Sequence, residues 1–380
     1  MMNNKSLSAL VDQVRGVSYK PKDIHDTLND LSIVLLRANN IFDGSVDFSD
    51  VIYIDRKRVS PSQILRRGDI LVCASSGSKD LVGKAASFNC DGEYTFGAFC
   101  KVVRPKNVDD ADYISMFFQS PKYRREIAAS ALGANINNIR NEHIDNLIIN
   151  WPVKLNRDII VSLLNQSKSI ITLRKKQLQL FDELIKARFV EMFGDPVKNP
   201  FGLPLKKLSE LGTLDRGRSK HRPRNAPELL NGPYPLIQTG EVAASDLYIT
   251  EYHNTYSEMG LKQSKMWKAG TLCITIAANI AQTAIMSFDA CFPDSVVGFV
   301  PGDKVSALYL HYWFGFFQKI LEEQAPQVAQ KNINLKILSD LSVIVPERER
   351  LTAFEDFVTQ VDKSKVMKRL RLAHFLFVDR

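Results

Sequence analysis

The sequence has few of the residues that build disulfides or metal sites. Its 380 residues include five cysteines and six histidines. The cysteines are odd in number, form no C-x-x-C pair and lie in apolar stretches, as buried reduced thiols do. The histidines lack the spacing of metal ligands. We therefore expect no disulfide framework and no metal site, and reduced thiols favour the cytoplasm as the location.

A long apolar run is also lacking. The residues after Met1 lead into no apolar segment of the kind found in signal peptides, and the most apolar window, 271–288, is interrupted by Asn279 and Gln282. A membrane-spanning helix needs about 20 predominantly apolar residues. We expect neither secretion nor a membrane span.

Three catalytic or nucleotide-binding signatures are incomplete. Segment 77–85 resembles a phosphate-binding P-loop, but five residues separate its glycines and Ala85 stands where a hydroxyl would hold magnesium. Segment 199–201 lacks a proline of the motif (Asn/Asp)-Pro-Pro-(Tyr/Phe) of DNA amino-methyltransferases, and no acidic-x-lysine follows Pro293-Asp294 as in a nuclease. We predict no catalytic residue. Segment 77–85 is either a tight hairpin or a loop that approaches DNA phosphate through Lys79.

Positive charge is present in moderate excess. The formal net charge is +8 and the pI is about 9.1, which favours a polyanion as partner. The excess is most concentrated at 216–224, where cations occupy every second position and would point one way in an extended segment, toward DNA phosphates or a guanine edge. A solvated loop face is the alternative interpretation. The candidate DNA contacts are Arg15, Lys20, Lys79, Lys84, Arg216, Arg218, Lys220, Arg222 and Arg224.

The chain contains an imperfect internal repeat. Leu7-Ser8-Ala9-Leu10 followed by Arg15-Gly16 recurs as Leu208-Ser209-Glu210-Leu211 followed by Arg216-Gly217, and the turn at Gly68 recurs at Gly270. Both copies close on a proline, Pro152 and Pro346. Because the matches keep their order while small loop changes shift the offset, they indicate one duplicated fold.

Each copy predicts an α+β globule followed by a long helix. Short apolar strands with glycine turns precede an aromatic amphipathic helix near 111–130 or 307–323 and a last strand. The apolar spacing then becomes helical, and Gly194 with Pro196 ends the first long helix. The expected parts are globule 1–152, helix 153–194, globule 195–346 with a linker at 195–204, and a shorter helix 347–380. Residues expected to pack the two helices together are Ile160, Leu163, Ile170, Leu173, Phe354, Phe357, Val361 and Met367.

This order of globule, helix, globule and helix resembles the specificity (S) subunit of type I restriction-modification systems. Local strings agree with that family, among them Arg66-Arg67-Gly68-Asp69-Ile70-Leu71, Val82-Gly83-Lys84-Ala85 and Phe189-Val190-Glu191-Met192-Phe193-Gly194-Asp195-Pro196. The resemblance implies two similar target-recognition domains, each reading one half of a bipartite double-stranded DNA site. It also implies that the two helices pack as an antiparallel coiled coil and dock methyltransferase subunits.

The family resemblance further implies that this chain is not itself an enzyme. Two methyltransferase (M) subunits and the restriction (R) subunits would carry S-adenosylmethionine, magnesium and ATP, and this chain would hold no cofactor. A free-standing, duplicated DNA-binding regulator is the alternative, and footprinting of a short site by the chain alone would favour it. The target bases are not predictable from the sequence, because recognition depends on the placement of individual side chains.

Overall fold

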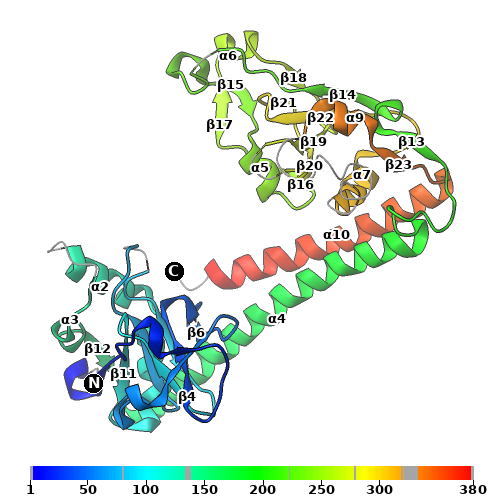
Figure 1. Cartoon of the computed structure of the whole chain (residues 1–380). Helices are drawn as coiled ribbons and strands as arrows, with labels where there is room; N and C mark the ends of the chain where they lie inside the picture. Colours follow the sequence, from blue (N-terminus) through cyan, green and yellow to red (C-terminus); the bar gives the residue numbers. More distant parts are fainter. Residues whose placement is uncertain are drawn as a thin grey trace. The chain divides into compact units, whose positions relative to one another are not determined.

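The computed structural model describes residues 3–78, 81–132, 138–221, 223–277, 280–317, 320 and 333–377. It divides into two compact units, Met1–Ile170 and Ile171–Arg380. The boundary falls inside helix α4, Lys154–Phe193, and not at the predicted end of the first globule. Each unit is an α+β globule, as predicted (Figure 1). Among the described residues, no helix is long and apolar enough to cross a membrane.

The first unit contains a six-stranded sheet of order β2-β11-β8-β9-β6-β5, a four-stranded sheet of order β10-β4-β7-β3, and the pair β1-β12. Its strands are β1 Asn3–Ser6, β2 Val11–Arg15, β3 Ile24–His25, β4 Ser32–Leu36, β5 Ile41–Phe42, β6 Ser45–Val46, β7 Ile52–Asp55, β8 Asp69–Cys73, β9 Ala85–Phe88, β10 Tyr94–Phe96, β11 Cys100–Pro105 and β12 Ile148–Trp151. Its shorter helices are α1 Ala111–Phe118, α2 Pro121–Leu132 and α3 Asn141–Asp145.

The second unit contains a five-stranded sheet of order β14-β22-β19-β20-β16, a four-stranded sheet of order β17-β15-β21-β18, and the pair β13-β23. Its strands are β13 Leu205–Lys207, β14 Gly212–Arg216, β15 Leu230–Leu236, β16 Tyr248–Ile249, β17 Asn254–Tyr256, β18 Met266–Trp267, β19 Leu272–Thr275, β20 Thr283–Met286, β21 Ala290–Cys291, β22 Val296–Pro301 and β23 Ser342–Ile344. Its helices are α5 Thr239–Ala244, α6 Glu258–Lys262, α7 Ala307–Phe314, α9 Leu335–Asp340 and α10 Arg348–Phe377.

The two units repeat one topology. The antiparallel run β2-β11-β8-β9 has its counterpart in β14-β22-β19-β20, and the parallel pair β4-β10 has its counterpart in β15-β21. The registers agree residue by residue, since Arg15 lies opposite Lys101 in the first unit and Arg216 opposite Val297 in the second. Strand register thus identifies equivalent positions without relying on sequence similarity.

Buried apolar side chains form the core of each unit. In the first unit they lie between β8 and β11 on one side and α1, α2 and α3 on the other. In the second they join β19, β22 and α7 to the C-terminal part of α4 and the start of α10. The aromatic run on α7 belongs to this core, because Tyr309 and Trp313 are fully buried.

Two helix predictions need correction. The first aromatic helix does not run through to residue 130, because α1 ends at Phe118 and α2 begins at Pro121. Proline is well suited to the first turn of a helix but cannot donate the backbone hydrogen bond that would continue one. In the second unit α7 ends at Phe314, and residues 321–323 of the predicted helix lie outside the described residues.

Candidate nucleic-acid interface

An Arg-Gly pair ends the first long strand of each unit because the backbone crosses another segment there. A Cβ on Gly16 would lie 2.1 Å from the carbonyl oxygen of Gly97, and a Cβ on Gly217 would lie 2.3 Å from the carbonyl oxygens of Phe292 and Pro293. No side chain fits at either crossing. Each glycine therefore fixes the position of the basic residue that precedes it.

The predicted arm at 216–224 begins where β14 ends, at Arg216. Arg216, Arg218 and Lys220 are exposed, whereas Gly217 and Ser219 between them are buried. This alternation places the three cations on the solvent side, as in an extended chain. Arg222 lies outside the described residues.

Acidic neighbours hold the arm in place. The Arg216 guanidinium donates to the carbonyl oxygen of Asp294 at 2.7 and 3.0 Å, and Arg224 pairs with the carboxylate of the same residue. The Arg218 guanidinium lies 3.7 Å from the Asp215 carboxylate. Among the described residues Lys220 has no ion-pair partner. The sequence does not indicate these pairings, because Asp294 lies 78 positions from Arg216 and 70 positions from Arg224.

The candidate cations of the first unit lie on more than one segment. Arg15 ends β2, Lys20 follows on the same segment, and Lys84 immediately precedes β9; all three are exposed. Strand register places Arg15 and Lys84 at the same end of the six-stranded sheet, because β11 and β8 lie between their strands. The structure thus places two cations that are 69 positions apart in the sequence at one end of the same sheet. Lys79 lies outside the described residues.

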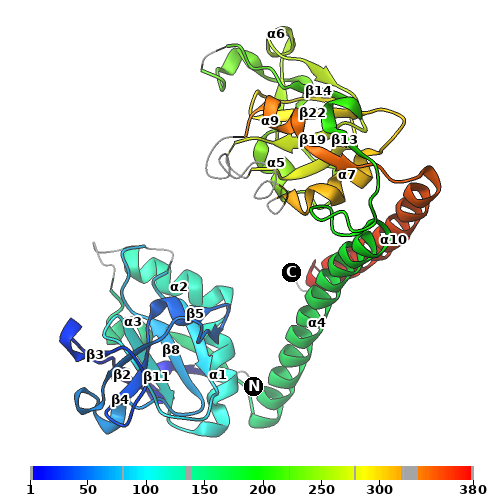
Figure 2. The same cartoon turned by 45° about the vertical axis from the view of Figure 1, so that its right-hand side comes forward.

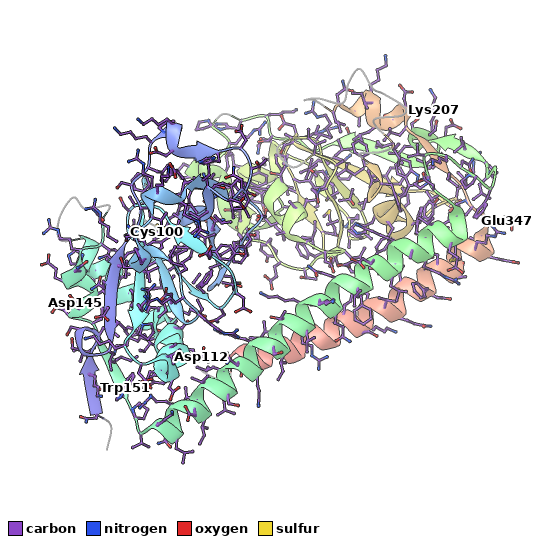
Figure 3. All side chains as sticks on the ribbon, turned by 60° about the horizontal axis from the view of Figure 1, so that its bottom comes forward. Cys100, Asp112, Asp145, Trp151, Lys207 and Glu347 are labelled. Carbon is purple, nitrogen blue, oxygen red and sulfur yellow. The ribbon has the colours of Figure 1, made fainter. Side chains whose placement is uncertain are left out.

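Helix α10 lies antiparallel along the C-terminal part of α4 (Figure 3). The ring of Phe354 on α10 contacts the rings of Phe189 and Phe193 on α4 at centroid distances of 5.6 and 5.4 Å. Of the other residues predicted on α10, Val361 is buried and Phe357 is partly buried. The Met367 side chain lies outside the described residues.

The residues predicted to pack from α4 are exposed in this chain. Their exposed fractions range from 36% to 63%, for Ile160, Leu163, Ile170 and Leu173. Phe189 and Phe193 of α4, near its C-terminal end, pack against α10. Helical spacing identifies an apolar stripe, but it does not show which part of the stripe meets the second helix.

A buried lysine joins α10, α4 and the second globule. The Lys365 side chain is 3% exposed, and its ammonium donates to the carboxylates of Asp182 on α4 and Asp246 after α5, at 2.6 Å each. Burial opposes the charged form, but the two hydrogen bonds outweigh it and raise the pKa of Lys365. This contact is not predictable from the sequence, because Lys365 has the helical spacing of an ordinary surface lysine.

His311 on α7 is a partly buried packing residue. Its Nδ1 lies 3.0 Å from the Thr283 hydroxyl on β20, and burial lowers the pKa of His311 to about 4. Within the described part of the chain no three His, Cys, Asp or Glu side chains are grouped to hold a metal ion. Because its pKa lies well below 7, His311 is neutral at physiological pH.

Comparison with known families identifies the second globule. The family model of the type I restriction modification DNA specificity domain matches residues 204–371. The resemblance predicted from the sequence is thereby confirmed, and the arm at 216–224 lies inside the matched residues.

Curated relatives carry the same family description. The chain is 34% identical over 180 residues to the type I restriction enzyme StySPI specificity subunit of Salmonella potsdam, covering 47% of this chain and 39% of the relative. The same values hold for the EcoKI specificity subunit of Escherichia coli K12. This chain therefore covers about two fifths of the length of these relatives.

Two solved structures share the fold over nearly the whole chain. A chain from a study of complex assembly and conformational transition of the type I R-M system aligns with a TM-score of 0.57 at 17% identity, covering 99% of this chain and 95% of that one. The type I S subunit from M. genitalium aligns with a TM-score of 0.56 at 13% identity, covering 100% and 94%. At such identities the likeness concerns the fold alone, and it covers both units.

Proposed function

We propose that this chain is the sequence-recognition subunit of a type I restriction-modification complex, with each unit reading one half of a bipartite double-stranded DNA target. The observation that carries the proposal is the repeated strand topology of the two units, one of which matches the type I DNA specificity domain. A duplicated target-recognition domain suits a bipartite target, because the side chains of each copy can differ while the shared strand framework is retained. The basic arm supports binding to phosphate.

The apolar residues exposed on α4 support a docking role for this helix. Leu163 and Leu173 are 58% and 63% exposed, and solvent-exposed leucines on a long helix favour a partner that covers them. In this proposal two methyltransferase subunits dock on the helices and the restriction subunits join through them. S-adenosylmethionine, magnesium and ATP would bind to those partners, and this chain would position them without catalysing a reaction.

The proposed location is the cytoplasm. The five cysteines are free, and four of them, Cys73, Cys100, Cys273 and Cys291, are buried. Reduced thiols of this kind are typical of a reducing compartment.

Purification of the tagged chain from its own host tests the assembly. We expect two methyltransferase subunits per chain and tight binding to a bipartite duplex only after they are present. Failure of any methyltransferase to co-purify would contradict the subunit role. Footprinting of a short site by the isolated chain would favour a free-standing regulator.

The basic arm provides a second test. Replacing Arg218, Lys220 and Arg222 by alanine should weaken DNA binding by the assembled complex and flatten the slope of log affinity against log salt concentration, since each lost phosphate contact releases about one counterion fewer. Binding titrations at several salt concentrations measure the slope. An unchanged slope would place the arm outside the interface, and Lys363→Ala on α10 is the control substitution.

A further inference from the structure

Each unit has a pocket at the same place in the repeated fold. In the first unit the pocket has a volume of about 600 Å³ and is bounded by the segments after β2, β4 and β8 and by the segment before β11. In the second unit the pocket has a volume of about 330 Å³ and is bounded by the segments after β14 and β15 and by the segment before β22. Strand register makes five lining positions equivalent, namely Ser18 and Ser219, Arg37 and Gln238, Ala38 and Thr239, Gly97 and Pro293, and Phe99 and Ser295.

The equivalent pockets differ in chemistry. Of those five positions only the serine is the same, and the exchange of Phe99 for Ser295 replaces an aromatic side chain by a hydroxyl. Phe99 is 71% exposed at the pocket of the first unit, so its ring is accessible to a ligand there. An equivalent position with exchanged side chains is what two domains that recognise different DNA sequences require.

Carboxylates orient the polar side chains at both pockets. In the first unit Asp50 accepts from Arg37 at 2.9 Å and from Asn39 at 2.6 Å, so one acid fixes two lining residues. In the second unit Asp294 binds Arg216 through its carbonyl and Arg224 through its carboxylate, next to Pro293 and Ser295. Side chains held in this way lose little freedom when they meet a ligand.

Both pockets lie at the strand ends opposite to the start of the long helices. In the first unit β11 begins beside the pocket at Cys100, and the segment that follows its other end holds the start of α4 through the pair Asp109–Lys154 at 2.7 Å. In the second, β22 begins after Ser295, and the carbonyl of Asp303 beyond its other end accepts from Arg348 of α10. Figure 1 shows β15 on the side of the second unit away from α10, and Figure 2 shows α6, which packs against β15, on that same side.

We infer that these two pockets receive the edges of DNA bases, and that their exchanged side chains make the two half-sites different. This inference rests on the proposed function and names the specificity-determining residues within it, Arg37, Asn39 and Phe99 in the first unit and Arg224, Gln238 and Ser295 in the second. Arginine reads guanine O6 and N7, asparagine and glutamine read adenine, and an exposed phenylalanine contacts a thymine methyl or stacks on a base.

Exchange of pocket residues between the units tests the inference. The assembled complex selects duplexes from a library with randomised positions, and the bound fraction is sequenced. Arg37→Gln with Phe99→Ser should reduce affinity for the wild-type target by about 10- to 100-fold and alter the selected bases in one half-site only. Gln238→Arg with Ser295→Phe should alter the other half-site only, and it remains informative if the first variant does not fold.

Phe42→Ser is the matched control, because Phe42 is 69% exposed in the same unit and does not line the pocket. We expect it to leave both half-sites unchanged. Unchanged base preferences in both folded exchange variants, or a uniform loss of binding across sequences, would overturn the pocket inference. If the wild-type complex itself selects no bipartite sequence, the proposed function fails instead.

Discussion

The two units share one fold, but the residues buried at equivalent positions differ. At the start of β8 the first unit buries Asp69, which accepts from the Arg104 guanidinium on β11 at 2.8 and 2.7 Å. The register-equivalent residues of the second unit are Thr271 and Val300. On β11 of the first unit Lys101 is also buried, and its equivalent on β22 of the second unit is Val297. The strand framework therefore does not depend on these charges, which stabilise only the copy that contains them.

The largest expected effect comes from breaking the Asp69–Arg104 pair. Arg104→Met leaves the fully buried Asp69 carboxylate without its main partner, which should destabilise the first unit by about 3–5 kcal/mol. Hydrogen exchange of β8 and β11 measures the loss, with β19 and β22 of the second unit as internal reference.

Introducing the second unit's residues at these two positions provides the control for the Asp69–Arg104 pair. The double variant Asp69→Thr with Arg104→Val removes both charges and should recover most of the lost stability, because no unpaired buried charge remains. If the double variant is as unstable as Arg104→Met, the two interiors are not interchangeable and the comparison fails.

A smaller effect is expected at the buried lysine of the second unit. Lys365→Met removes hydrogen bonds to Asp182 and Asp246, whose side chains remain 45% and 34% exposed and can be solvated. We expect a loss of about 2–3 kcal/mol, seen as faster hydrogen exchange in α10. The exposed neighbour Lys363 should tolerate the same substitution, and equal effects at both positions would show that Lys365 makes no special contribution.

The smallest effect is a pH dependence confined to the second unit. The pKa of His311 is lowered by burial from 6.5 to about 4, so the unfolded chain binds the proton first as the pH falls. Stability should therefore decrease below pH 6.5 and keep decreasing toward pH 4, by about 1 kcal/mol between pH 6.5 and 5.5. The charged groups around His311 are Asp246, Lys365 and Asp182.

The variant His311→Asn should remove this component of the pH dependence. Ser115 holds the equivalent position on α1 and does not titrate, so exchange rates in the first unit serve as the reference. Urea unfolding followed at several pH values measures the slope. A slope that persists unchanged in His311→Asn would assign the pH dependence to other groups.

Much of the architecture could be predicted from the sequence because it depends on local patterns. The apolar spacing of residues 154–193 specifies a helix whatever surrounds it, and Gly194, at a φ of +78°, ends it as predicted. The turns at Gly68 and Gly270 share φ values of +87° and +86°, which few other residues adopt. The resemblance to type I specificity subunits followed from the order of these local elements.

The candidate site could be predicted only in part, because its contacts join distant segments. The sequence located a basic arm, but only the folded chain brings Asp294 against Arg216 and Arg224 and buries Lys365 between Asp182 and Asp246. The sequence by itself determined the repeat, the strands and the long helices, since these depend on periodicity and on glycine and proline. The tertiary structure decided which charges are paired and which side chains line the pockets, because burial and distance arise only when strands far apart in sequence meet.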